Sequence, residues 1–211
     1  MRFHPSIQGR AAEMADLAQT VRRLVAATVL NRADPAELSA CTRELEALVD
    51  RLEATVPSPP PPVTDVGARG TMIDGATMAE ALAFDVVIGR YSPLALPVRI
   101  EFDPPRALGY ATFTLPYEGP PGCVHGAVIA ATFDIILTAA NVVAGMPGLT
   151  ATLNTSFVRP TLLNEETTFE ATAVRREGRR ISTSGRALQR GIVTAEAQGS
   201  FVHVDRGRTA P

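Results

Sequence analysis

One long apolar segment, Val124–Ala144, constrains the fold more than any other part of the chain. It contains a single acidic residue and no arginine. Large apolar side chains recur at helical spacing on one face, at Ile129, Phe133 and Ile136, and the opposite face carries small residues. A helix that is apolar or small on all sides is usually buried. We therefore predict a central buried helix over residues 126–144.

Strand-like runs lie on both sides of this helix. They cover Val98–Phe102, Ala107–Leu115 and residues 149–159, 166–175, 180–190 and 192–204. Short turns separate most of the later runs, which suits an antiparallel meander better than parallel crossovers. A short helix is also expected at Met78–Val87. The predicted fold class is therefore α+β, with a sheet that wraps against one long helix.

The first sixty residues predict a helical hairpin. Leu17, Val21 and Leu24 recur at helical spacing in the first helix, and an Asp-Pro-Ala-Glu sequence that begins at Asp34 is typical of a capped helix start. The second helix then carries a stripe of leucines at 38, 45, 48 and 52. Two such helices alone bury little, so we expect the hairpin to serve oligomerisation or docking.

A proline-rich segment with the sequence PSPPPP, at residues 57–62, separates the hairpin from the rest of the chain. Polyproline of this kind is a stiff spacer. We therefore divide the chain into an N-terminal helical hairpin (1–56), a linker (57–64) and one main domain (65–211).

Composition excludes several classes of function. The net charge is −2, and all 20 basic residues are arginine, so there is no basic excess to indicate a nucleic-acid partner. The two cysteines, Cys41 and Cys123, are too few for a disulfide framework or a metal site. We find no signal-peptide core and expect no membrane span. A cytoplasmic protein with reduced thiols is expected.

Asp134 is the acidic residue within the predicted central helix, and it lies on the face of small residues. A buried carboxylate without a partner costs several kcal/mol. Asp134 is therefore a candidate functional group. The alternative is a structural carboxylate that caps a neighbouring backbone or pairs with a distant arginine.

His125 and Gly126 stand where the central helix begins. The first amides of a helix have no intrahelical acceptor, and the helix dipole favours negative charge there. Glycine also lets a ligand approach the backbone closely. Residues 122–127 are therefore a candidate oxyanion hole, with Asp134 about two turns further along the helix. The alternative is an ordinary turn into a helix.

These residues resemble a known family. The text EGPPGCVHGAVIAATFDIILTAA resembles the helix segment of hotdog-fold thioesterases of the phenylacetate-pathway type, in which a His-Gly-Gly turn precedes a helix of small residues with an Asp nine positions after the His. His125 and Asp134 have that spacing. GLTATLNTSFVRPTLL resembles the strand that follows, and GRYSPLALPVRIEF resembles a bacterial subgroup. The resemblance covers residues 85–204.

The resemblance implies a hotdog fold, in which a curved antiparallel sheet wraps around the central helix. It also implies hydrolysis of acyl-CoA without metal or other cofactor, by homodimers or tetramers with active sites at subunit interfaces. It makes Asp134 the general base or nucleophile and the Gly126 amide the group that polarises the thioester carbonyl. His125 then supports the turn, and Thr150 positions water or the carboxylate.

Two departures from the family pattern concern the substrate side of the site. Ala127 replaces the second glycine of the motif, and Gly119 stands where some relatives carry an Asn. Glu118, beside it, is a candidate substitute acid–base partner. The predicted substrate-binding residues are Glu118, Gly119, Gly122, Ala127, Arg159 and Arg179, the two arginines being candidates for the phosphates of CoA.

Other functions stay open at this stage. A non-catalytic acyl-CoA- or lipid-binding hotdog module would keep the fold without the chemistry. A dehydratase would need a buried histidine, which the central helix lacks. A Cys123 nucleophile beside His125 would need a third orienting group, and none is evident.

Overall fold

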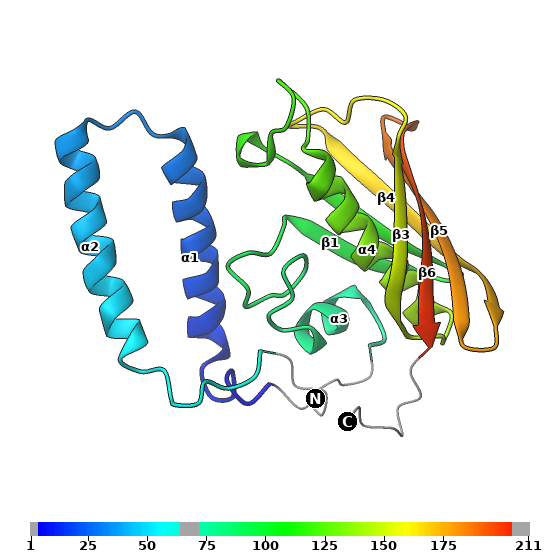
Figure 1. Ribbon diagram of the computed structural model, residues 1–211, viewed down its shortest axis with the longest axis horizontal. Coiled ribbons are helices and arrows are strands. Elements are labelled where there is room, and N and C mark those ends of the chain that lie inside the picture. The colour runs from blue at the N-terminus through cyan, green and yellow to red at the C-terminus, as the bar shows by residue number, and fades with distance from the viewer. Residues whose placement is uncertain (1–3, 64–71, 204–211) are drawn as a thin grey trace.

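The computed structural model describes residues 4–63 and 72–203, in which a six-stranded sheet curves around one long helix (Figure 1). In chain order the elements are α1 (Ala11–Leu30), α2 (Pro35–Glu53), α3 (Gly75–Ala81), β1 (Val98–Asp103), β2 (Arg106–Thr112), the 3-10 helix η2 (Leu115–Tyr117), α4 (Gly126–Val143), β3 (Gly148–Phe157), β4 (Glu166–Glu177), β5 (Arg180–Gln189) and β6 (Ile192–His203). The predicted α+β class and curved antiparallel sheet are confirmed.

The strands run in the spatial order β1-β2-β4-β5-β6-β3, and every neighbouring pair is antiparallel. The predicted meander is correct for β4, β5 and β6. It is wrong for β3, which precedes them in the chain but pairs with β6 at the far edge. The chain leaves β3 through residues 158–165 and returns beside β2, so β1 and β3 are the two edge strands. Turn spacing alone could not show this crossing.

Two other predictions are corrected in the segment before α4. The run Ala107–Leu115 ends as a strand at Thr112, and its last residue, Leu115, begins the 3-10 turn of η2. The short helix expected at Met78–Val87 lies earlier, at Gly75–Ala81. Asp74 and Thr77 form a capping box that fixes where this helix begins.

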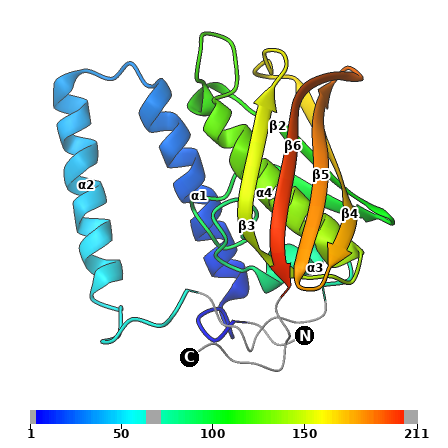
Figure 2. The same ribbon diagram turned by 45° about the vertical axis from the view of Figure 1, so that its right-hand side comes forward.

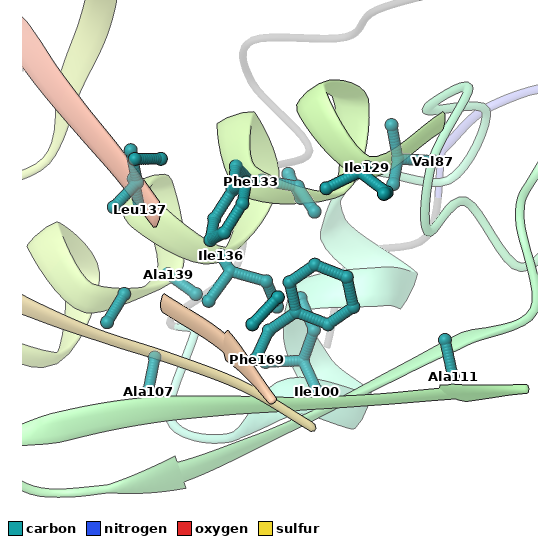
Figure 3. Close-up of a cluster of buried hydrophobic side chains, with 14 of the residues drawn as sticks. Val87, Ile100, Ala107, Ala111, Ile129, Phe133, Ile136, Leu137, Ala139 and Phe169 are labelled. Carbon is teal, nitrogen blue, oxygen red and sulfur yellow. The ribbon is translucent and has the colours of Figure 1, made fainter. Parts of the chain in front are cut away.

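The core lies between α4 and the concave face of the sheet (Figure 3). Phe133 and Ile136 of α4 are fully buried, and the ring of Phe133 meets that of Phe169 edge to face with centroids 5.3 Å apart. Gly109 lets β2 approach the helix, since a Cβ there would lie 2.4 Å from Cδ1 of Ile136. The predicted buried central helix is confirmed, and it ends at Val143.

α4 is also the one helix among residues 4–63 and 72–203 that is long and apolar enough to cross a membrane by length and composition. Half of its residues are buried inside the protein. The sheet wraps around this helix, so its apolar character matches its place in the core.

α1 is attached to the main domain, whereas α2 is not. The guanidinium of Arg22 donates hydrogen bonds to the backbone carbonyls of Ser92 (2.7 Å) and Arg90 (3.0 Å). Ile7 and Tyr91 are buried in a small second core beneath the start of α1. α2 buries none of its residues and projects beside α1 on the outside of the molecule (Figures 1 and 2).

The predicted helical hairpin is therefore present, and Asp34 caps α2 by accepting a hydrogen bond from the amide of Glu37 at 2.9 Å. The proline-rich segment passes beside His4, whose ring nitrogen Nε2 lies 3.1 Å from the carbonyl oxygen of Pro62. The boundary predicted between residues 64 and 65 lies outside the described residues.

The core packing predicts the effect of removing one aromatic ring. Replacing Phe169 with Ala should lower the free energy of unfolding by about 3–5 kcal/mol, because the ring is fully buried against α4. Val174 lies on the same strand and is 66% exposed, so Val174→Ala should change stability by no more than about 0.5 kcal/mol. Chemical denaturation measures both, and equal losses would contradict the assigned core.

Candidate active site

His125 fixes the turn where α4 begins. It is the N-cap residue, and its ring Nδ1 accepts a hydrogen bond from the Ala127 amide at 3.0 Å. The His125 amide in turn donates to the carbonyl oxygen of Tyr117 at 2.9 Å. A ring nitrogen thus replaces the hydroxyl or carboxylate that usually caps a helix. His125 thus caps the start of α4, and the Ala127 amide already has a partner.

Gly126 is the first residue of α4, and its amide donates to no described residue. This amide therefore keeps its hydrogen for a ligand at the positive end of the helix dipole. A Cβ on Gly126 would lie 3.1 Å from Cζ of Phe157, so the aromatic ring of β3 closes over the glycine. Phe157 was not predicted, because no local pattern links two residues so far apart in sequence.

The residues before His125 form a tight turn. The Glu118 carboxylate accepts a hydrogen bond from the Gly122 amide at 2.7 Å, and Gly122 has a φ of +74°. The Gly119 amide donates to the carbonyl oxygen of Cys123 at 2.9 Å. Glu118 and Gly122, both predicted to bind substrate, thus bind each other and shape the turn.

Gly119 approaches His125 closely. A Cβ at Gly119 would lie 2.8 Å from Cα of His125, a contact with backbone that cannot move without displacing the turn. The Asn that some relatives carry at this position therefore does not fit the backbone arrangement found here. The departure noted in the sequence accompanies a change in local packing.

Tyr117 supports the turn from the side of the N-terminal helix. Its ring meets Phe113 edge to face at 5.7 Å. Burial raises the pKa of the Tyr117 phenol, and the nearby positive charge of Arg22 opposes that rise. The phenol therefore stays protonated at neutral pH, and α1 contributes a charge to the surroundings of the turn.

Asp134 and Thr150 are in direct contact. The Thr150 hydroxyl donates a hydrogen bond to Oδ1 of Asp134 at 2.8 Å and joins the middle of α4 to the edge strand β3. The expectation that Asp134 is buried needs correction, because the residue is only half-buried and Thr150 is exposed. The edge strand leaves this side of α4 open. Among the described residues no arginine forms an ion pair with Asp134.

The two predicted catalytic groups, the Gly126 amide and the Asp134 carboxylate, lie far apart within one chain. Gly126 and Asp134 are eight residues apart on one helix, which is about 12 Å along its axis. A single carbonyl group cannot contact both. Phe157, at the end of β3, lies beside Gly126, and Thr150, near its beginning, lies beside Asp134.

The two predicted phosphate-binding arginines are not brought together. Arg159 follows β3 on the Phe157 side, and its guanidinium donates to the carbonyl oxygen of Val193 at 3.2 Å. Arg179 lies in the β4–β5 turn and donates to the carbonyl oxygen of His203 at 3.5 Å. His203 pairs with Gly148, so Arg179 lies near the opposite end of β3. Both arginines are exposed.

Two other chemistries find little support in this geometry. Within residues 4–63 and 72–203 no three His, Cys, Asp or Glu side chains gather as metal ligands would. The thiol of Cys123 lies 3.6 Å from the carbonyl oxygen of Pro121, and Nδ1 of His125 already accepts from an amide. The Cys–His pair that a thiol nucleophile needs is therefore not formed.

Comparison with known proteins identifies the family. The family model of the thioesterase superfamily matches residues 121–198. A crystal structure described as a thioesterase superfamily protein is 32% identical and has a TM-score of 0.77, with 90% of this chain and 94% of that chain covered. The protein belongs to the thioesterase superfamily, and its fold is the hotdog fold.

More distant structures are also similar to this chain. Thioesterase superfamily member 2 of zebrafish is 16% identical, with a TM-score of 0.53 over 63% of this chain and 99% of that chain. The E. coli PaaI protein of the phenylacetic acid degradation operon is 16% identical, with a TM-score of 0.49 over 52% of this chain and 81% of that chain. No curated protein matches the sequence.

The packing around Gly119 predicts that restoring the Asn of some relatives is unfavourable. Gly119→Asn should lower the free energy of unfolding by roughly 1–3 kcal/mol, because the new Cβ meets the backbone of His125. Gly122→Asn places the same side chain in open space at a positive φ that Asn tolerates, and should cost about 1 kcal/mol or less. Thermal unfolding compares the two variants, and a more stable Gly119→Asn protein would contradict the assigned packing.

Proposed function

We propose that the protein hydrolyses acyl-CoA thioesters to a free acid and CoA. Membership of the thioesterase superfamily supports thioester hydrolysis in general. The observation that carries the specific proposal is the placement of two groups on α4. They are the helix-start amide of Gly126, which has no acceptor among the described residues, and the carboxylate of Asp134, which is oriented by a hydroxyl.

These groups have complementary roles in thioester hydrolysis. The Gly126 amide and the positive end of α4 bind the thioester carbonyl oxygen and stabilise the negative charge that develops on it. Asp134 removes a proton from water as the water attacks the carbonyl carbon. Alternatively, Asp134 attacks the carbon itself, and water then hydrolyses the mixed anhydride. In both routes the carbon–sulfur bond breaks, and CoA leaves as a thiolate that takes up a proton.

The distance between Gly126 and Asp134 favours a site shared by two subunits. β3 is an edge strand whose backbone is open to pairing, and it exposes Leu149 and Phe157. Antiparallel pairing with β3 of a second copy would set the Thr150 end of one strand against the Phe157 end of the other. Asp134 of one subunit would then face Gly126 of the partner subunit, and a dimer would contain two sites.

The proposal also includes an arginine that binds a phosphate of CoA. Arg159 lies on the Gly126 side of β3, where an arginine is suited to bind a phosphate of CoA. Arg179, near the opposite end of β3, remains a second candidate.

Cys41 and Cys123 are both free thiols, and we propose a cytoplasmic location, in which such thiols stay reduced.

Asp134→Asn should abolish most of the activity while leaving the protein folded. The substitution keeps the shape of the side chain but removes the base or nucleophile, so kcat should fall by about 10²–10⁴-fold. Release of free thiol from a panel of acyl-CoAs measures the loss. Full activity in this variant would exclude the proposed mechanism, whichever acyl chain is used.

Thr150→Val should lower kcat about tenfold or more, because the valine cannot donate to Asp134 and the carboxylate loses its orientation. Thr150→Ser retains the hydroxyl and is the matched control, with activity close to that of the wild type. A valine variant as active as the serine variant would show that Thr150 has no positioning role.

Two inactive variants should complement each other if the site is shared. Gly126→Pro removes the amide hydrogen at a helix position that accepts proline, and Gly126→Ala, which adds a Cβ but keeps the amide, is its control. A heterodimer of Gly126→Pro and Asp134→Asn chains has one intact site, so it should show about half of wild-type activity. Differently tagged chains allow the heterodimer to be purified. An inactive heterodimer would mean that each site lies within one chain.

The alternative is a non-catalytic hotdog module that binds acyl-CoA or lipid. It is favoured by Gly119, which stands where some relatives have an Asn. This alternative predicts that acyl-CoA raises the melting temperature while no thiol is released. Thioester hydrolysis by the pure protein, lost in Asp134→Asn, would exclude it.

A further inference from the structure

α2 makes no extensive contact with any other described helix or strand. None of its 19 residues is buried. Leu38 and Leu52 are each 44% exposed, Val49 is 49% exposed, and Leu45 and Leu48 are half-buried. An isolated helix of this length is only marginally stable in water, and helices gain most of their stability by burying an apolar face. α1, by contrast, is held to the main domain through Arg22.

The apolar residues of α2 have the spacing of a coiled-coil seam. Leu38, Cys41, Leu45, Leu48 and Leu52 follow one another at alternating intervals of three and four residues. This spacing places them in a single stripe that suits pairing with one other helix. The part of the chain that the structure describes offers no such helix, because α1, which runs beside α2 in the hairpin, makes no extensive contact with it (Figures 1 and 2).

Two charged residues of opposite sign flank this stripe on the same side. Glu44 and Arg51 are seven residues apart and so occupy equivalent places in successive heptads. The residues three and four positions away from each of them are uncharged. Neither forms an ion pair with any described residue. Both charges are thus available to a partner that lies along the stripe.

A second copy of α2 in antiparallel orientation satisfies both features. When Leu45 packs against Leu48 of the partner subunit, the two-fold axis makes the reciprocal contact as well. In this register Glu44 faces Arg51 of the partner subunit, and the pair also occurs twice. A shift by one heptad would oppose Glu44 to Glu44 of the partner subunit. A parallel pair would instead place Glu44 opposite Val49 of the partner subunit.

We propose that α2 is a self-association arm, which pairs with α2 of a second copy in this antiparallel register. The contact lies on the N-terminal hairpin, away from β3 and from the site at α4 (Figure 2). It therefore doubles the number of subunits in whatever assembly the β3 edge forms. The proposal does not depend on the thioesterase reaction.

The mass of the full-length protein in solution tests the arm. Leu45→Glu combined with Leu48→Glu puts charge into the stripe and should halve the mass measured by sedimentation equilibrium. Ala36→Glu combined with Ala47→Glu adds the same charge on the exposed opposite face, and should leave the mass unchanged. Equal masses for the wild type and the leucine variant would overturn the proposal. Thioester hydrolysis per subunit should be the same in all three proteins.

A charge exchange tests the orientation with conservative surface changes. Glu44→Arg or Arg51→Glu alone puts two like-charged pairs into the antiparallel contact, and each should weaken self-association about tenfold. The double variant restores opposite charges in both pairs and should associate as the wild type does. A double variant that stays as weak as the single variants would overturn the antiparallel arrangement.

Cross-linking tests the register directly. In the proposed pair Leu52 faces Cys41 of the partner subunit, so Leu52→Cys in a Cys123→Ser background should form covalent dimers on mild oxidation. Ala47→Cys in the same background is the control and should not. Failure of the Leu52→Cys protein to cross-link, or equal cross-linking through Cys41 alone, would overturn the register.

Discussion

The packing of α4 against the concave face of the sheet is the contact on which the rest of the structure depends. Phe133 and Ile136 fill the space beneath β2 and β4, and Gly109 lets the sheet approach the helix closely. A core packed this tightly leaves little freedom to translate or rotate the helix. The positions of Gly126 and Asp134 are therefore set by the core, although neither residue is part of it.

The same helix carries the two groups proposed to act on the thioester, and they lie too far apart to act together in one chain. Gly126 uses the end of the helix, where an amide and the dipole are available, and Asp134 uses its middle, where the edge strand β3 leaves one side open. β3 contacts both places, through Phe157 and Thr150. The proposed site, completed by a second subunit, would resolve the separation and would also account for the exposed apolar side chains on an edge strand.

The two helices of the N-terminal hairpin differ in their contacts with the main domain. α1 is attached to the main domain, since Arg22 donates hydrogen bonds to the carbonyl oxygens of Gly89, Arg90 and Ser92 in the loop before β1 and contributes a charge near Tyr117. Among the described residues α2 makes no comparable contact, and its leucine stripe is exposed at Leu38 and Leu52 and half-buried at Leu45 and Leu48. A helix with such a stripe and unpaired flanking charges has the features of an assembly contact.

The sequence by itself determined the features that depend on local spacing. The apolar period of residues 126–143, the capped start of α2 at Asp34 and the strand-forming runs all follow from neighbouring residues. Family resemblance added the roles proposed for His125 and Asp134. Only the tertiary structure decided the crossing of β3 to the far edge, the hydrogen bond between Thr150 and Asp134, and the closure of Phe157 over Gly126. Such contacts join distant residues, and they are fixed by how the helix and sheet fill a shared core.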